Sequence, residues 1–116
     1  MKKKIITAFL SAIMILVMGT TVFASSGSWR YDGYGWWYEY DQGGYAASRW
    51  EDIDGSWYHF NYNGYMDTGW IYDGAWYYMN PDGTMATGWV FDGLNWYYMG
   101  TSGAMQTGWI NDGTDW

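Results

Sequence analysis

Cysteine is absent from this chain of 116 residues, and proline occurs only once. Without cysteine, no disulfide can staple a small exported domain, and neither a thiolate metal site nor a cysteine nucleophile can form. Bases are also scarce, because only Arg30 and Arg49 lie beyond the first 24 residues. There, two bases against twelve acids give a net charge of −10, which excludes a basic patch for phosphates. The composition therefore favours cationic partners and predicts no nucleic-acid binding.

Long apolar runs are missing except at the N-terminus. Three lysines, Lys2–Lys4, precede an apolar stretch from Ile5 to Met18, and small residues at Val22 and Ala24 follow. This layout is typical of a secretory signal peptide, so we predict one at residues 1–24, cleaved after Ala24. An uncleaved membrane anchor is the alternative, because the segment up to Ala24 is about long enough to cross a bilayer. With the leader removed, residues 25–116 remain as one small exported domain.

One pattern recurs about every 20 residues through this domain. The first series of tryptophans is Trp29, Trp50, Trp70, Trp89 and Trp109, and the second is Trp37, Trp57, Trp76, Trp96 and Trp116. Asp-Gly pairs and further glycines recur between them at the same period. Self-similarity at a fixed period indicates a repeat protein. We predict a repeat domain at 25–116 with units at about 29–49, 50–69, 70–88 and 89–108, and a partial unit at 109–116.

Each unit contains the signals of a β-hairpin. A short strand leads into an Asp-Gly turn, an aromatic strand such as "WYHF" or "WYYM" follows, and a glycine-bearing loop leads to the next unit. Asp-Gly between aromatic runs is a strong hairpin signal, and glycine at this density leaves no window for a helix. The sequence therefore predicts an all-β fold, a solenoid of stacked β-hairpins in which each hairpin buries its aromatic face against its neighbours.

Turn length decides which rings meet across a hairpin. A two-residue turn at Asp92-Gly93 predicts that Trp89 and Trp96 are direct cross-strand partners. The third unit is one residue shorter between its tryptophans, so a three-residue loop at Asp73–Ala75 is needed to keep both on one face. The paired tryptophans of a unit are thus expected to share a face.

The segment "GWIYDGAWYYMNPDGTMATGW", residues 69–89, resembles the choline-binding repeat of Gram-positive and phage surface proteins and autolysins, also called the cell-wall-binding repeat. The resemblance extends from Trp29 to Trp116, because G-W, W-Y-Y, the loop glycine, the methionine and T-G-W recur in order. It implies a left-handed solenoid in which choline headgroups of teichoic acid sit between successive hairpins. Each site is then a cage of two tryptophans from one unit and a tyrosine of the next, with a methionine beside them.

Carried over to this sequence, the resemblance implies three complete cages. They consist of Trp29, Trp37 and Tyr58; of Trp50, Trp57 and Tyr77; and of Trp70, Trp76 and Tyr97. Trp89 and Trp96 form a fourth pair for which the sequence offers no following tyrosine, and Met85 and Met105 are expected beside the rings. Aromatic faces suit a quaternary ammonium because this cation cannot donate a hydrogen bond. Arg49, which replaces the usual glycine before the tryptophan, could stack on Trp50 and compete with a cationic ligand.

Catalysis and metal binding have little support in the sequence. His59 is the only histidine and lies among aromatics, and the repeated aspartates occupy turns that favour Asp-Gly for backbone reasons. We therefore predict a non-catalytic binding module without metal or cofactor, secreted and attached non-covalently to the cell wall. The alternative is a carbohydrate-binding module whose partner is a glucan or a surface polysaccharide. The unfinished hairpin after Trp109 indicates either a fragment of a longer chain or self-association through an open edge.

Overall fold

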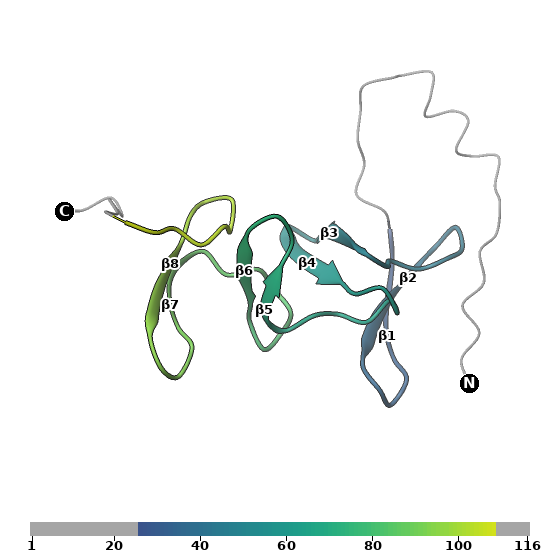
Figure 1. The fold of residues 1–116 in the computed structure, drawn as a ribbon. Helices are drawn as coiled ribbons and strands as arrows, with labels where there is room; N and C mark the ends of the chain where they lie inside the picture. Colours follow the sequence, from purple (N-terminus) through teal and green to yellow (C-terminus); the bar gives the residue numbers. More distant parts are fainter. Residues whose placement is uncertain (1–25, 109–116) are drawn as a thin grey trace, which may run out of the picture. The chain divides into compact units, whose positions relative to one another are not determined.

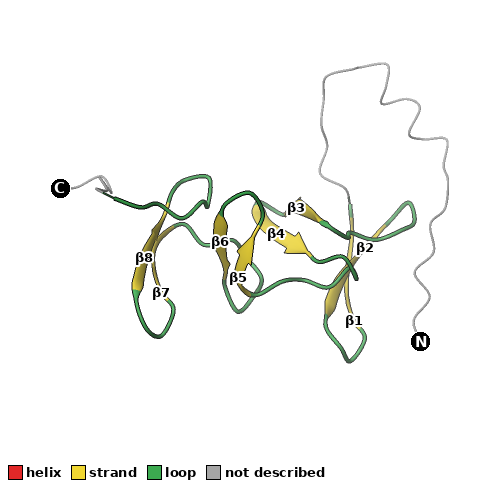
Figure 2. Cartoon of the chain, viewed as in Figure 1, coloured by secondary structure: helices red, strands yellow, loops and turns green. Residues whose placement is uncertain are grey.

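The computed structural model describes residues 26–108, which form only β-strands and loops (Figure 2). Within this range, eight strands pair in chain order as four antiparallel hairpins (Figure 1). The pairs are β1 (Gly27–Tyr31) with β2 (Trp36–Tyr40), β3 (Arg49–Ile53) with β4 (Ser56–Phe60), β5 (Gly69–Tyr72) with β6 (Trp76–Met79), and β7 (Gly88–Phe91) with β8 (Trp96–Met99). The prediction of an all-β chain of successive hairpins is confirmed.

Two predicted segments, the signal peptide at 1–24 and the partial unit at 109–116, lie outside the described residues. Among residues 26–108, no helix has the length and apolar character that crossing a membrane requires.

The loop after each second strand folds back in the same way. After β6, the Gly83 N–H donates to the carbonyl oxygen of Asn80, and the Asn80 N–H donates to that of Thr84, both at 2.7 Å. The same two hydrogen bonds recur in the loops after β2, β4 and β8. Gly83 has a φ of 90°, in the left-handed region that glycine enters without steric cost. The glycine that recurs in the sequence is therefore a requirement of this loop.

The turns inside the hairpins set the strand register. Asp54 and Gly55 have φ values of 53° and 88°, the left-handed pair that a two-residue type I′ turn requires. In the third hairpin, Tyr72 pairs with Trp76 across the three residues Asp73–Ala75. The predicted length of that loop is confirmed.

The fourth hairpin differs from its prediction. Trp89 pairs with Tyr98, so the prediction that Trp89 directly faces Trp96 is wrong. The Asp92 carboxylate accepts two backbone N–H groups of the following residues, and this closes a four-residue loop in place of a two-residue turn. An aspartate at the first loop position stabilises this longer loop through its side chain.

The chain divides between Met66 and Asp67 into two compact units of two hairpins each. The buried core of the first unit consists of Tyr38, Ala46, Ile53 and Phe60, with Trp29, Tyr58 and Met66 packed against it. The core of the second consists of Ala86, Val90 and Met99, with Trp70, Tyr97 and Met105 packed against it. Within each unit, the two hairpins bury their apolar faces against one another. The aromatic residues predicted to bind a ligand therefore border a hydrophobic core.

Candidate binding site

In each hairpin, one tryptophan of the first strand and one of the second share a face of the sheet. In every hairpin, the second-strand tryptophan of this pair lies at or near the start of its strand. The first-strand tryptophan pairs with the residue two positions further along the second strand. The pairs are Trp29 with Tyr38, Trp50 with His59, Trp70 with Tyr78, and Trp89 with Tyr98. Since side chains alternate along a strand, the two tryptophans are one diagonal step apart on the same face, within reach of each other.

In the second unit this arrangement forms an open pocket of about 350 Å³, lined by Trp70, Trp76, Tyr97 and Met105, which we call the C-terminal cage. Trp70 of β5 is the central ring. Its centroid lies 6.2 Å from that of Trp76, with the ring planes at 87°, and 4.8 Å from that of Tyr97 in β8, with the planes at 78°. Three ring systems from two hairpins thus surround one space.

A backbone hydrogen bond holds the fourth wall of the C-terminal cage in place. The Met105 N–H, in the loop after β8, donates to the carbonyl oxygen of Trp76 at 2.8 Å. The bond brings the loop of the fourth hairpin against the ring-bearing strand of the third. Met105 therefore lines the pocket because its loop is hydrogen-bonded to the backbone of Trp76, another lining residue.

A carboxylate orients the central ring from the adjacent hairpin. The Trp70 indole N–H donates to Oδ2 of Asp92 at 3.2 Å, across the gap between the third and fourth hairpins. Hydrogen bonds from the backbone N–H groups of Asn95 and Leu94, together with that from Trp70, lower the pKa of Asp92 below that of an ordinary aspartate. The carboxylate is therefore ionised at neutral pH.

The walls of the C-terminal cage are suited to a compact cation. None of the four lining side chains is charged, and Trp76 is 45% exposed, so the pocket opens to solvent on that side. Aromatic faces attract a cation through the ring quadrupole, each by about 0.5–2 kcal/mol depending on desolvation. The thioether of Met105 adds a polarizable, adaptable contact. A quaternary ammonium group, which needs no hydrogen-bond acceptor, fits this chemistry.

The first unit repeats the arrangement with Trp29, Trp36, Tyr58 and Met66, which we call the N-terminal cage. The centroids of Trp29 and Tyr58 lie 4.9 Å apart, with the rings at 66°. The Met66 N–H donates to the carbonyl oxygen of Trp36 at 2.8 Å, as Met105 does to Trp76. The strand register places Trp36 on the same face as Trp29.

The prediction that Trp37 is the partner of Trp29 is wrong. Trp37 lies on the opposite face of the hairpin, is 1% exposed and packs against Tyr45, with ring centroids 6.1 Å apart. A buried ring on that face cannot line the open site of Trp29. Trp36, which is 46% exposed, takes the position.

The sequence contained a signal for this assignment. Trp36 follows Trp29 by seven residues, the spacing of Trp50 to Trp57 in the next hairpin. With Trp36 as the first residue of the W-Y-Y triplet, Trp37 occupies the first tyrosine position. Two adjacent tryptophans allowed either alignment, and only the register decides between them.

The other predicted site residues fall into two groups. Trp50 and Trp57 share a face of the second hairpin but belong to the first unit, whereas Tyr77 and Met85 belong to the second. Their assembly into a cage stays a prediction. Trp89 and Trp96 share a face of the fourth hairpin and are 51% and 65% exposed.

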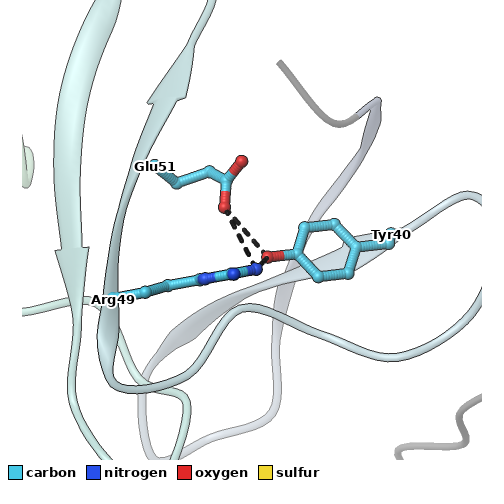
Figure 3. Close-up of polar contacts among 3 residues, drawn as sticks. All are labelled: Tyr40, Arg49 and Glu51. Carbon is cyan, nitrogen blue, oxygen red and sulfur yellow. Dashed lines mark hydrogen bonds and ion pairs between the residues drawn. The ribbon is translucent and has the colours of Figure 1, made fainter. Parts of the chain in front are cut away.

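Arg49 does not take the position predicted for it. Its guanidinium Nη1 donates to the Tyr40 hydroxyl at 2.8 Å and lies 3.9 Å from Oε1 of Glu51, as Figure 3 shows. The Tyr40 hydroxyl donates in turn to the same Glu51 oxygen at 2.9 Å. Since Arg49 and Glu51 alternate with Trp50 along β3, these contacts lie on the face opposite the Trp50 ring. The arginine joins two hairpins of the first unit instead of covering a ligand site.

Tandem hairpins with aromatic cages between neighbours define a repeat protein with candidate sites for small ligands. A family model described as a choline-binding repeat matches residues 46–81 and 72–112. The chain belongs to the choline-binding repeat family. Among curated protein sequences there is no match.

Solved structures show the same relationship. The multimodular pneumococcal cell-wall endolysin of phage Cp-1, solved in complex with choline, is 46% identical, with a TM-score of 0.70 over 75% of this chain and 26% of that one. Choline-binding protein F of Streptococcus pneumoniae is 41% identical (TM-score 0.68; 76% of this chain, 30% of that one). CbpJ of the same organism is 40% identical (TM-score 0.69; 76% and 31%). The chain thus spans less than a third of the length of these proteins.

Proposed function

We propose that this chain is a non-catalytic cell-wall module that binds the choline headgroups of teichoic acid in its aromatic cages. The observation that carries the proposal is the C-terminal cage, where four uncharged side chains line an open pocket of about 350 Å³ between two hairpins. Three ring faces suit a trimethylammonium group, which has no hydrogen to donate. The family assignment and the endolysin solved with choline support the same ligand.

Weak sites in series explain why the module is a repeat. Three aromatic faces, less the cost of immobilising the ligand, correspond to a dissociation constant on the order of millimolar. Several such sites on a polymer that repeats its own headgroups gain affinity through effective concentration. We accordingly propose a secreted protein attached non-covalently to the wall, with Trp50, Trp57, Tyr77 and Met85 as a further site. Self-association through residues 109–116 stays a prediction, because they lie outside the described range.

A choline titration tests the proposal against glycan binding. We expect a saturable change in tryptophan fluorescence with choline, with a midpoint on the order of millimolar, because the rings that change environment are the ligand walls. Glucose oligomers serve as the parallel titration, since sugars also stack on aromatic faces but need hydrogen-bonding groups around the ring. A response to the oligomers without one to choline would move the chain to the carbohydrate-binding class.

Two neighbouring tryptophans test the composition of the N-terminal cage. We expect Trp36→Ala to weaken choline binding there about tenfold, because it removes one aromatic wall. Trp37→Tyr is the matched variant, since it introduces the residue that Tyr58, Tyr77 and Tyr97 supply in the other hairpins, and its affinity is expected to stay within about twofold. Binding is followed at the indole N–H resonance of Trp29. Loss of binding in Trp37→Tyr but not in Trp36→Ala would reverse the assignment.

A further inference from the structure

Asp92 divides its two carboxylate oxygens between two tasks. Oδ1 accepts the backbone N–H groups of Leu94 and Asn95, each at 2.9 Å, and thereby closes the turn between β7 and β8. Oδ2 is left for the Trp70 indole N–H at 3.2 Å. The turn fixes the carboxylate, and the carboxylate meets the edge of the central ring of the C-terminal cage.

This contact changes what the Trp70 ring offers to a ligand. A hydrogen bond to an anion is charge-assisted, and polarisation along it shifts electron density toward the indole ring. The negative charge also lies beside the ring that a cation would cover, at a partly exposed site where Coulomb attraction is not fully screened. Both effects favour a cation over a neutral group of equal size.

The N-terminal cage lacks this contact. Asp92 lies four residues before Trp96, the second-strand tryptophan of its hairpin. The residue four before Trp57, at the same position in the second hairpin, is Ile53, which is 5% exposed in the apolar core. Within residues 26–108, no hydrogen bond joins the Trp29 indole to a carboxylate. The two cages have the same kinds of side chain as walls, and of the two central rings only Trp70 donates a hydrogen bond to a carboxylate.

We propose that Asp92 is a specificity-determining residue of the C-terminal cage, which makes that cage prefer a cation to a neutral ligand of the same shape. The inference rests on the proposed function, since it assumes that the cage binds choline. It adds that the two cages discriminate unequally between charged and neutral headgroups.

The test uses the full chain and the variant Asp92→Asn. Asparagine keeps an Oδ1 that accepts the two turn N–H groups but presents an Nδ2 donor to the indole N–H, so the turn is retained while the charge and the acceptor are lost. The probes are choline and its neutral isostere 3,3-dimethylbutan-1-ol, in which carbon replaces the nitrogen. Binding is followed at the indole N–H resonances of Trp70 and Trp29, each assigned by its loss on replacement with phenylalanine.

We expect Asp92→Asn to weaken choline binding at Trp70 about fivefold and isostere binding by less than about twofold. Binding at Trp29 is expected to stay unchanged for both ligands. Asp82→Asn is the control, because it removes the same charge from a carboxylate that is bonded elsewhere. The Asp82 carboxylate accepts the backbone N–H and the hydroxyl of Thr84 in the loop after β6. Its affinities are expected to match those of the unmodified chain.

Other outcomes overturn the inference in distinguishable ways. Equal weakening of both ligands at Trp70 would mean that Asp92 only positions the ring, and unchanged choline affinity would mean that it contributes nothing. Equal weakening by Asp82→Asn would reduce the effect to net charge. Absence of any choline response in the unmodified chain would overturn the proposed function, and the inference with it.

Discussion

Phe60→Ala is expected to lower the free energy of unfolding of the first unit by about 3–5 kcal/mol, the cost of a large cavity in a packed core. Phe60 is fully buried in β4 among Tyr38, Ala46 and Ile53, and its ring lies 5.6 Å from that of Trp29. The side chain is one of the largest in the core that the two hairpins of the first unit share. Guanidinium unfolding followed by circular dichroism measures the change.

The control for this prediction is Tyr62→Ala. Tyr62 is two residues further along and 80% exposed, so its removal is expected to change stability by less than about 0.5 kcal/mol. Because repeats contact mainly their neighbours, resonances of the second unit should persist at denaturant concentrations where those of the first unit are lost. A small effect of Phe60→Ala, similar to that of Tyr62→Ala, would show that this cluster does not hold the hairpins together.

Trp76→Ala is expected to reduce choline affinity at the C-terminal cage by about tenfold or more, since it removes one of three aromatic walls and opens the pocket. Trp76 is 45% exposed, so the fold tolerates its loss better than that of a core residue. Its backbone carbonyl, which holds the Met105 loop, remains in the variant. Affinity is read from the Trp70 indole resonance during a choline titration.

Trp96→Ala is the matched control for the C-terminal cage. Trp96 occupies the same position in the fourth hairpin, is 65% exposed and does not line the pocket. Its loss is expected to leave the affinity reported by Trp70 within about twofold. Equal losses in Trp76→Ala and Trp96→Ala would show that the response comes from the exposed aromatic surface as a whole and not from the cage.

Much of this structure was predictable because the repeat supplies the same local signals four times. Asp-Gly pairs, aromatic strands and loop glycines each favour one conformation, and their period excluded other folds. The placement of Trp70 and Trp76 on one face followed from the shorter spacing between them, which required a three-residue loop. A turn or strand predicted in one repeat can be compared with the same positions in the other repeats, which a sequence without repeats does not allow.

The errors arose where two local solutions were equally good. Trp36 and Trp37 both satisfied the aromatic pattern, and only the paired strand decided which ring is buried. Asp92-Gly93 suits a two-residue turn, but the side-chain bonds of Asp92 to the backbone favour a longer loop. The bond from the Met105 N–H to the Trp76 carbonyl joins residues far apart in sequence and has no local signal at all.

Because of that backbone bond, the proposed ligand site lies at the junction between two hairpins. Tyr97 and Met105 come from one hairpin, and Trp70 and Trp76 from the hairpin before it, so neither hairpin holds a complete cage alone. The number of sites in such an array follows the number of neighbouring pairs and not the number of repeats. Duplication of one hairpin repeat would add a site and leave the existing ones unchanged. Loss of an internal repeat would instead bring together two hairpins that were not neighbours before, and a site would form only if their rings matched. A change in the number of repeats would thus change the avidity of the array.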